Sequence, residues 1–497
     1  MNLSKSRFME CYQCTKAGYL SLHRPEILER DSQSKEMLEK GTEIGEIARM
    51  ILGDYKLVEV VPNKTKMLED TAIMISAGIP VIAEASFASK NCFCSTDIIK
   101  VIDKDNCVID VYEVKSSTSI KPEHIIDMAF QYYTITNAGY KVRNFFHVSI
   151  NSDYIRDEEL DINELFNVVN VLPDIMKNQS VITDNIDVFS DVLDEKEEPS
   201  VAIGVHCKSP HECPYFKYCT KHLPTPNVFD LTGKGITFAK KIELYSKGIY
   251  SFEDVISRDS KLKKERLDEV RCFVTGTDLP NKVEEIREFL KQFKYPINFF
   301  DFESYQSAIP EFVWSKPYIQ MPFQYSLHIL HEDGKLEHRE FIAPVGSDCR
   351  IAVAENIIED LCSNNGSIVA YNAPFEKMVI KDLAELLPHK YSVLMALRER
   401  FIDLIVPFSK QWIYKNAFKG KTSIKYVLPA LFPDDDTLNY KNLEMIQNGT
   451  DAMDAYKNLR TKDKEEQEKV IANLYKYCYL DTFALYKIFM YLVDLCK

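Results

Sequence analysis

The chain lacks the apolar segments that would place it in or across a membrane. Residues 1–7 contain no hydrophobic core of the kind that a signal peptide needs. The most apolar window, residues 72–88, is interrupted by Gly78, Pro80 and Glu84 and is too short to span a bilayer. We therefore expect a cytoplasmic protein with no membrane partner.

An excess of positive charge is also missing. The 497 residues include 75 acidic and 61 basic side chains, for a net charge of −14 at pH 7. This argues against a protein that attracts nucleic acid through its overall field. It leaves room for a nuclease, because acidic metal sites add negative charge and local basic patches can bind the substrate. The thirteen cysteines, without a secretory signal, are more typical of thiols or metal ligands than of disulfides.

Internal repeats and low-complexity tracts are absent as well, so the chain is expected to fold as ordinary domains. Helix-like and strand-like segments alternate in residues 1–222 and again in 294–497, and a Lys/Glu-rich helical pattern fills 223–293. We predict an α/β protein made of these three regions. The acidic stretch 184–198 is predicted to be a solvated connection.

The sequence pattern predicts helices and strands in the first and the last region. In the first region we predict three helices, at 6–29, 40–52 and 122–137. Four strands are expected between and after them, at 81–87, 95–101, 107–114 and 144–150. In the last region we expect strands at 297–302, 325–330 and 368–371, and a long final helix that starts near Asp463.

Two short strings carry the chemistry, and the first is Glu113-Val114-Lys115, which follows Asp97. On a strand the i, i+2 spacing places Glu113 and Lys115 on one face. Two carboxylates can hold Mg²⁺ or Mn²⁺, while Lys115 stabilises negative charge or positions the attacking water. Gln131, on the predicted helix that follows, could orient the substrate. The alternative is a surface strand with a salt bridge.

These residues resemble the PD-(D/E)xK nucleases of the RecB type, with which residues 3–8 and 41–46 also agree. The resemblance implies a restriction-endonuclease-like fold for residues 1–222. It also implies an acidic residue or His on the second helix, for which Glu46 is the candidate and Glu43 the alternative.

Four cysteines bracket this region: Cys14, Cys207, Cys213 and Cys219. One upstream and three downstream cysteines resemble the iron–sulfur nucleases of the AddB and CRISPR-associated RecB-like families. That resemblance implies a four-iron cluster ([4Fe–4S]) that joins the two ends of the domain. Cys11 could replace Cys14, and His206 or His211 could replace a cysteine. Structural zinc also suits four thiolates, and unliganded thiols are the third reading.

The second string is Asp301-Phe302-Glu303, with Glu376 and a distant Tyr477-x-x-x-Asp481. Asp301 and Glu303 would share one face of an apolar strand, and residues four apart share one face of a helix. Unpaired acids among apolar side chains are costly, and a bound metal would offset that cost. The alternative is a pair of surface acids on an edge strand.

This order of residues resembles the DEDD exonucleases of the ribonuclease H-like fold, in the branch with a Tyr in the third motif. The resemblance implies that Asp301, Glu303 and Asp481 are metal ligands and that Tyr477 orients the nucleophilic water. Glu376 stands where the family has Asp, and its extra methylene moves the carboxylate. Residues 294–497 also resemble an uncharacterised bacterial domain that follows RecB-type nuclease domains. Asp403 lies at a position that is acidic near such clefts, or is a simple helix residue.

A basic and aromatic stretch, residues 410–421, is the candidate nucleic-acid interface. Lysines can bind phosphates while aromatic rings stack on bases. The candidate residues are Trp412, Lys415, Lys419, Lys421 and Lys425. A lysine-rich loop with core aromatics is the alternative.

The sequence therefore predicts a bacterial, divalent-metal-dependent nuclease with two sites joined by a helical connector. The resemblance to RecB-type nucleases favours DNA over RNA as the substrate. A role in DNA repair or antiviral defence is expected from that resemblance alone. The alternatives are a nucleic-acid-binding or scaffold protein with one or both sites inactive, and an RNA-processing exonuclease.

Overall fold

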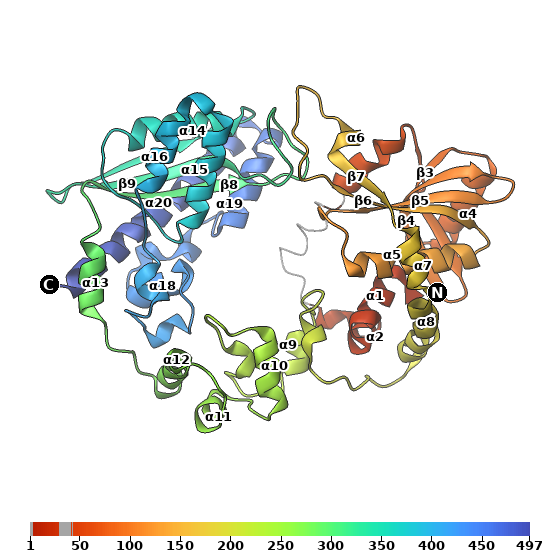
Figure 1. The fold of residues 1–497 in the computed structure, drawn as a ribbon, viewed down its shortest axis with the longest axis horizontal. Coiled ribbons are helices and arrows are strands. Elements are labelled where there is room, and N and C mark those ends of the chain that lie inside the picture. Colours follow the sequence, from red (N-terminus) through yellow and green to blue (C-terminus); the bar gives the residue numbers. More distant parts are fainter. Residues whose placement is uncertain (1–2, 29–40, 42) are drawn as a thin grey trace. The chain divides into compact units, whose positions relative to one another are not determined.

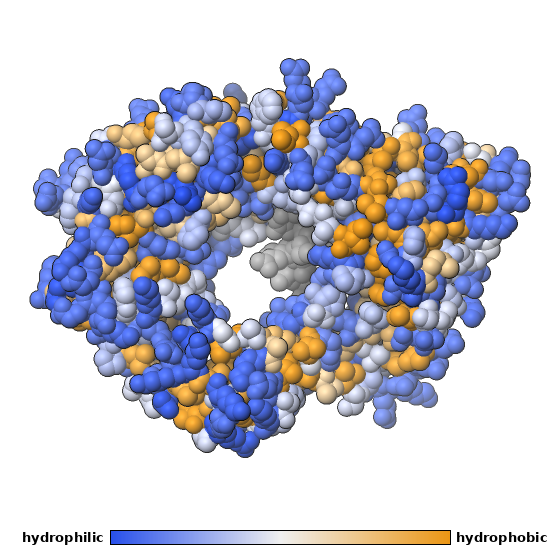
Figure 2. Space-filling model, in the orientation of Figure 1, coloured by the Kyte–Doolittle hydropathy of each residue, from blue (hydrophilic) through white to orange (hydrophobic). Residues whose placement is uncertain are grey.

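The computed structural model describes residues 3–28, 41 and 43–497, and it divides the chain into two compact units (Figure 1). Unit 1 comprises Met1–Leu223 with Ser307–Tyr318, and unit 2 comprises Pro224–Gln306 with Ile319–Lys497. The predicted helical connector thus falls within unit 2. Among the described residues, no helix is both long and apolar enough to cross a bilayer. Hydrophilic side chains cover much of the face drawn in Figure 2, between smaller hydrophobic patches.

Unit 1 is built on a mixed sheet with the order β2-β3-β4-β5-β6-β7, to which β1 adds by pairing with β4. Strands β3, β4 and β5 are antiparallel, and β6 runs parallel to β5 after a crossover through α5 (Pro122–Asn137). The strands are β1 (Leu3–Ser4), β2 (Lys56–Leu57), β3 (Val81–Ser89), β4 (Cys92–Asp103), β5 (Val108–Lys115), β6 (Lys141–Ile150) and β7 (Phe166–Asn170).

Helices cover this sheet and bury its main core. Phe8 contacts Phe130 and Phe189, with ring centroids 4.7 and 5.2 Å apart, so α1, α5 and α8 share one apolar layer. The other helices of unit 1 are α1 (Lys5–Gln13), α2 (Thr15–His23), α4 (Lys64–Ser76), α6 (Ile162–Leu165), α7 (Leu172–Lys177), α8 (Gln179–Asp194) and α9 (Phe216–Thr220), with 3₁₀ turns η1 (Pro25–Ile27), η2 (Arg49–Leu52) and η3 (Val205–Cys207).

Two predictions for unit 1 are wrong. The stretch 184–198 is not a solvated connection, because α8 continues to Asp194 and buries Ile186, Phe189 and Leu193. These apolar residues follow the helical period, while the acids that dominate the composition occupy the exposed face. The predicted helix 6–29 is two helices, since Cys14 has extended backbone (φ −162°) and separates α1 from α2.

The segment Ser307–Tyr318, which lies between β8 and β9 in the sequence, packs within unit 1. Arg156 exchanges backbone hydrogen bonds with it: its N–H donates to Ser315 O at 3.0 Å, and its O accepts from Trp314 N at 2.8 Å. The Tyr318 hydroxyl donates to Ser116 O at 2.5 Å. This segment is therefore a part of unit 1 that the sequence pattern did not assign to it.

Unit 2 contains a five-stranded sheet with the order β10-β9-β8-β11-β12. Strand β8 is central: it is antiparallel to β9 and parallel to β11. The long helix α20 (Lys464–Leu495) packs on β8, β9 and β10, and it begins next to Asp463, its N-cap, as the predicted start near Asp463 requires. The strands are β8 (Ile297–Tyr305), β9 (Met321–Leu330), β10 (Leu336–Ile342), β11 (Ile368–Ala370) and β12 (Phe401–Asp403). The chain is thus α/β, as predicted.

The remaining helices of unit 2 fall into two groups. Those before the sheet are α10 (Phe238–Ser246), α11 (Phe252–Ser257), α12 (Lys264–Thr275) and α13 (Val283–Leu290), after the turn η4 (Val228–Asp230). Those that follow β10 in the sequence are α14 (Cys349–Leu361), α15 (Pro374–Leu386), α16 (Tyr391–Glu399), α17 (Val406–Ser409), α18 (Ile424–Leu431) and α19 (Gly449–Lys457), with 3₁₀ turns η5 (Pro388–Lys390), η6 (Asn416–Phe418), η7 (Asp436–Leu438), η8 (Tyr440–Asn442) and η9 (Asn458–Thr461).

Candidate functional sites

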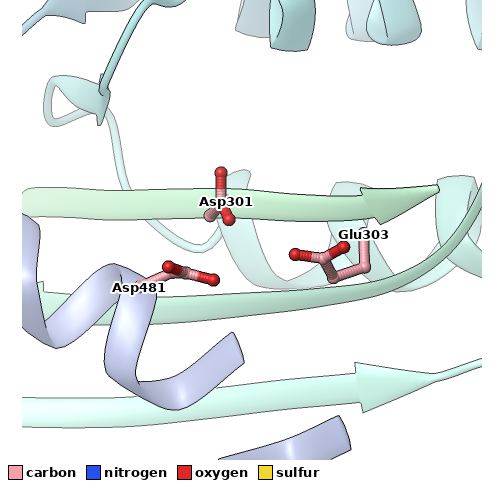
Figure 3. A group of neighbouring side chains, drawn as sticks. All are labelled: Asp301, Glu303 and Asp481. Atoms are coloured by element: carbon pink, nitrogen blue, oxygen red, sulfur yellow. The ribbon is translucent and has the colours of Figure 1, made fainter. Parts of the chain in front are cut away.

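Three carboxylates converge on the central strand of unit 2. Asp301 and Glu303 lie on β8, and Asp481 reaches them from α20 (Figure 3). One oxygen from each side chain lies within 4.8 Å of the others, and no other group of three metal-binding side chains in the described part of the chain meets that distance. The strand spacing predicted from the sequence therefore places both acids toward the same helix.

Two tyrosines lie beside Asp481. Tyr440, from η8, donates a hydrogen bond to Asp481 Oδ1 at 2.6 Å. Tyr477 lies one turn before Asp481 on α20, and its ring lies beside that of Tyr440, with centroids 5.9 Å apart. The sequence predicted Tyr477 but missed Tyr440, which lies forty-one positions from Asp481 and shares no motif with it.

Burial and mutual repulsion disfavour the charged forms of these acids. Burial, and then the neighbouring Asp481, raises the pKa values of Asp301 and Glu303 well above their usual range. Burial also raises the pKa of Asp481 to about 7, although the hydrogen bond from Tyr440 opposes the shift. Oδ2 of Asp481 is buried and has no hydrogen-bond partner among the described residues. A divalent cation would stabilise the charged forms that this geometry otherwise destabilises.

Glu376 belongs to the same electrostatic group without completing the three-carboxylate cluster. It lies in the first turn of α15 and is 3% exposed, and it helps raise the pKa of Asp301. Burial raises its own pKa to about 8, and its Oε2 has no partner among the described residues. Asp403 instead braces the backbone: its Oδ1 accepts from the N–H groups of Asn372 and Ile405 at 2.9 and 3.0 Å.

The first site, in unit 1, is an ion-pair network around Glu113. Glu113 Oε1 accepts from Lys115 Nζ and from Lys5 Nζ, both at 2.8 Å. Lys115 also contacts Asp127 of α5. Asp97, on β4, accepts from the backbone N–H of Val114 at 2.6 Å. The sequence predicted Asp97, Glu113 and Lys115 here, but it gave no role to Lys5 or Asp127.

The lysines decide the charge of this network. Burial disfavours the Glu113 carboxylate, but Lys115 and Lys5 outweigh it and hold the pKa of Glu113 below its usual range. Burial, followed by repulsion from Glu113, raises the pKa of Asp97 to about 7. Glu113 Oε2 is buried, and no described residue hydrogen-bonds it. That oxygen is thus the free ligand atom that a metal could take.

Of the other residues predicted for the first site, Gln131 is buried, whereas Glu46 is exposed. Gln131, on α5, is completely buried, and both of its polar side-chain atoms lack a hydrogen-bond partner among the described residues. Such atoms are costly unless a ligand or water satisfies them. Glu46 and its alternative Glu43 are both exposed, and the structure does not bring them into the network around Glu113.

The four predicted cysteines line one small cavity in unit 1, although they come from residue 14 and from 207–219: Cys14, Cys207, Cys213 and Cys219. His206 lines it too, and its buried Nε2 has no hydrogen-bond partner in the described part of the chain, whereas His211 is not part of the lining. Gln13 fastens the two ends together, because its Nε2 donates to the carbonyls of His206 and His211, both at 2.7 Å.

The thiols of this cavity differ from Cys11, which is a core residue. Burial raises the pKa of Cys213 to about 11, and the other three cysteines of the cavity add to the shift. Cys11 is 2% exposed and packs so tightly on Gly18 that a Cβ there would lie 2.1 Å from its sulfur. Cys14, not Cys11, therefore faces the shared cavity.

In the basic stretch 410–421 most aromatic rings point inward. Tyr414 and Phe418 are buried, and Trp412 is partly buried against Phe289 of α13, with ring centroids 6.0 Å apart. Among the lysines, Lys425 acts electrostatically on the acidic site. Its positive charge partly offsets the rise in the pKa values of Glu303 and Asp481 that burial causes. Lys415 lies over the ring of Tyr491 at 5.8 Å, and Lys419 and Lys421 are exposed.

The lysines of this stretch give a test that does not depend on its rings. Changing Lys415, Lys419 and Lys421 together to Ala should weaken oligonucleotide binding and flatten its salt dependence by up to about two to three units of slope, less if contacts are partial. Fluorescence anisotropy at several salt concentrations measures this. As a control, three exposed lysines at 261–264 are changed to Ala. Equal slopes for the two triple variants would assign the predicted lysines to a solvated face.

Residues 298–423 match the family described as a domain of unknown function, DUF2779. The matched stretch runs from β8 to the segment before α18, so it includes Asp301, Glu303, Glu376 and Asp403 but neither Tyr477 nor Asp481. No curated protein matches the chain.

Proposed function

We propose that the protein is a divalent-metal-dependent nuclease that hydrolyses phosphodiester bonds of nucleic acid. The observation that carries the proposal is the convergence of Asp301, Glu303 and Asp481, whose oxygens approach within 4.8 Å although Glu303 is buried and the other two acids are partly buried. Carboxylate oxygens are the ligands that Mg²⁺ and Mn²⁺ take in phosphoryl-transfer sites.

In unit 2 these three carboxylates would hold the metal, which supplies a Lewis acid for the phosphate and a more acidic bound water. Tyr440 fixes the orientation of the Asp481 carboxylate, and Tyr477, one turn before Asp481 on α20, would orient the attacking water. Glu376 is a fourth acid at the edge of the cluster. The D-x-E pair on the central strand of a mixed sheet, with α20 across it, supports the ribonuclease H-like, DEDD-type assignment.

In unit 1 we assign the first nuclease site to Asp97, Glu113 and Lys115. Glu113 Oε2 and Asp97 would hold the metal, while Lys115, fixed between Glu113 and Asp127, stabilises negative charge on the phosphate. The parallel β5–α5–β6 crossover that carries Glu113, Lys115 and Gln131 supports the restriction-endonuclease-like, RecB-type assignment.

The cysteine cavity supports a four-iron cluster as the structural cofactor of unit 1. Four thiolates are the ligand set that such a cluster takes, and here they join the end of α1 to residues 207–219. Structural zinc is the alternative metal for the same four cysteines. A cytoplasmic location is part of the proposal, since a reducing compartment keeps such thiols available.

DNA is the proposed substrate in preference to RNA, because the RecB-type resemblance of unit 1 favours DNA ends. A role in DNA repair or antiviral defence follows from the same resemblance. A deciding experiment incubates the full chain with end-labelled single- and double-stranded DNA and RNA, with Mg²⁺, Mn²⁺ or EDTA. Cleavage of RNA alone would favour the RNA-processing exonuclease. Binding without cleavage under either metal would leave a nucleic-acid-binding protein.

The two sites should separate by mutation. Lys115→Met removes charge stabilisation in unit 1 and Asp301→Asn removes a metal ligand in unit 2, so each variant should lose one product pattern and keep the other. The double variant should cleave nothing. Denaturing gels of end-labelled products measure this. If both single variants keep every product, neither cluster is catalytic. Glu376→Asp, which keeps the charge, should retain detectable activity of the second site, and Glu376→Ala should not.

A further inference from the structure

Lys5 occupies a position in the first site that the nuclease motif does not account for. It is the first residue of α1, after the Ser4 cap, and its Nζ lies 2.8 Å from the same Glu113 oxygen that Lys115 contacts. Two ammonium groups therefore share one carboxylate oxygen. This arrangement leaves Glu113 Oε2 free, so the lysines and a metal would use different oxygens of one side chain.

The two lysines are not equivalent. Lys115 lies between two carboxylates, Glu113 and Asp127, and its side chain is 19% exposed. Lys5 has Glu113 as its ion-pair partner among the described residues and is 26% exposed. An ammonium group has three N–H donors, and the pair with Glu113 uses one of them. Lys5 thus keeps two donors for an anion that approaches from solvent, whereas Lys115 keeps one.

The charge balance of the site leads to the same conclusion. With Asp97, Glu113 and Asp127 counted as ionised, three negative and two positive side chains give a net charge of −1. One divalent cation would change this to +1, whereas without Lys5 the loaded site would be neutral. The adjacent His124 and His147 add no charge near neutral pH, because burial lowers the pKa of both, that of His147 to about 4.

We propose that Lys5 binds a non-bridging oxygen of the scissile phosphate at the first site, as a second catalytic ammonium beside Lys115. The inference rests on the proposed nuclease function and adds its substrate-binding cation. The contact of its ammonium group with Glu113 Oε1 at 2.8 Å holds Lys5 at the site in this role. Its contact with the phosphate strengthens as negative charge develops on the phosphoryl oxygens.

The test uses the full chain carrying Asp301→Asn, so that the second site is silent. Into it are placed Lys5→Met, Lys5→Arg and the control Lys100→Met, an exposed lysine on β4 of the same unit. We expect Lys5→Met to lower kcat by about 100-fold, the effect of removing one preorganised donor. Lys5→Arg should recover at least part of that loss, and Lys100→Met should match the parent.

Two further measurements separate phosphate binding from a structural role. With Ca²⁺ in place of Mg²⁺, Lys5→Met should flatten the salt dependence of duplex binding by up to about 0.9 units of slope, one lost phosphate contact. Its Mn²⁺ affinity should not weaken, because a positive charge near the metal has been removed. Parent-like kcat and slope in Lys5→Met would overturn the proposal, as would a parallel loss of Mn²⁺ affinity and thermal stability in both Lys5 variants. If the Asp301→Asn parent is active, Lys115→Met is inactive and Lys5→Met is active, the assignment of Lys5 alone is overturned. If the Asp301→Asn parent shows no cleavage, the proposed nuclease function of the first site is itself overturned.

Discussion

Asp301→Asn should make the metal-free protein more stable and should abolish its stabilisation by Mg²⁺ or Mn²⁺. The folded-state pKa of Asp481 is about 7 against an ordinary value of 3.8, and burial also raises the pKa values of Asp301 and Glu303 well above their usual range. The stability that the neutral acids contribute is therefore present below pH 3.8 and is lost as pH rises through the folded-state values. At pH 8 the uncharged amide that replaces the Asp301 carboxylate avoids part of that loss.

We expect a gain of about 1 kcal/mol or more in metal-free stability at pH 8, which is roughly 2–4 °C in the melting temperature of a unit of this size. Wild-type protein should gain stability from the metal, and more at pH 8 than at pH 6, because metal binding must displace the protons that the acids hold. The variant should gain none in unit 2. Second-site cleavage should fall by at least about 100-fold, since the metal both activates water and stabilises charge.

Differential scanning calorimetry with and without metal measures both effects. Asp434→Asn is the matched control, because Asp434 is an exposed acid of the same unit and lies outside the cluster. A metal-free melting temperature that falls in Asp301→Asn, together with an unchanged response to Mg²⁺, would show that the three acids do not form a metal site.

The parts of the site that the sequence predicted are those whose spacing matches a regular element. Asp301 and Glu303 are two apart on a strand, and Tyr477 and Asp481 are four apart on a helix, so each pair shares a face whatever the rest of the fold. Tyr440 and Lys5 have no such spacing to their partners. They reach the sites through tertiary packing of a 3₁₀ turn and of the first helix.

Composition was a weaker guide than periodicity. The stretch 184–198 is rich in acids, yet α8 buries Ile186, Phe189 and Leu193 at helical spacing. In residues 410–421 the interleaved lysines and rings suggested an interface, but Tyr414 and Phe418 lie in the core. Counting residue types does not tell which side chains of a segment face inward, because that depends on what packs against it.

The second large effect is expected from Cys213→Ala. The protein purified without oxygen should be brown, with broad visible absorption from an iron–sulfur cluster, and the variant should be colourless. Cys213 lies on a cavity that also receives Cys14, and its backbone N–H donates to Cys207 O at 2.9 Å, so the cavity is held from both ends of unit 1. A cluster there closes a loop of about two hundred residues, and the variant lacks this constraint because it lacks the cluster.

Links that close long loops stabilise proteins by about 2–4 kcal/mol, so the melting temperature of unit 1 should fall by roughly 4–16 °C in the variant. Cys362→Ala is the control: Cys362 is exposed and lies in unit 2, and its replacement should change neither colour nor stability. Absorption spectra with iron, sulfide and zinc analyses distinguish the ligands. A colourless wild-type protein with one zinc per chain would show that zinc, and not a cluster, links Cys14 to residues 207–219. A tetrahedral zinc binds four sulfurs at about 2.3 Å. Wild-type protein with neither metal, and with the same melting temperature as Cys213→Ala, would show that the four thiols only pack.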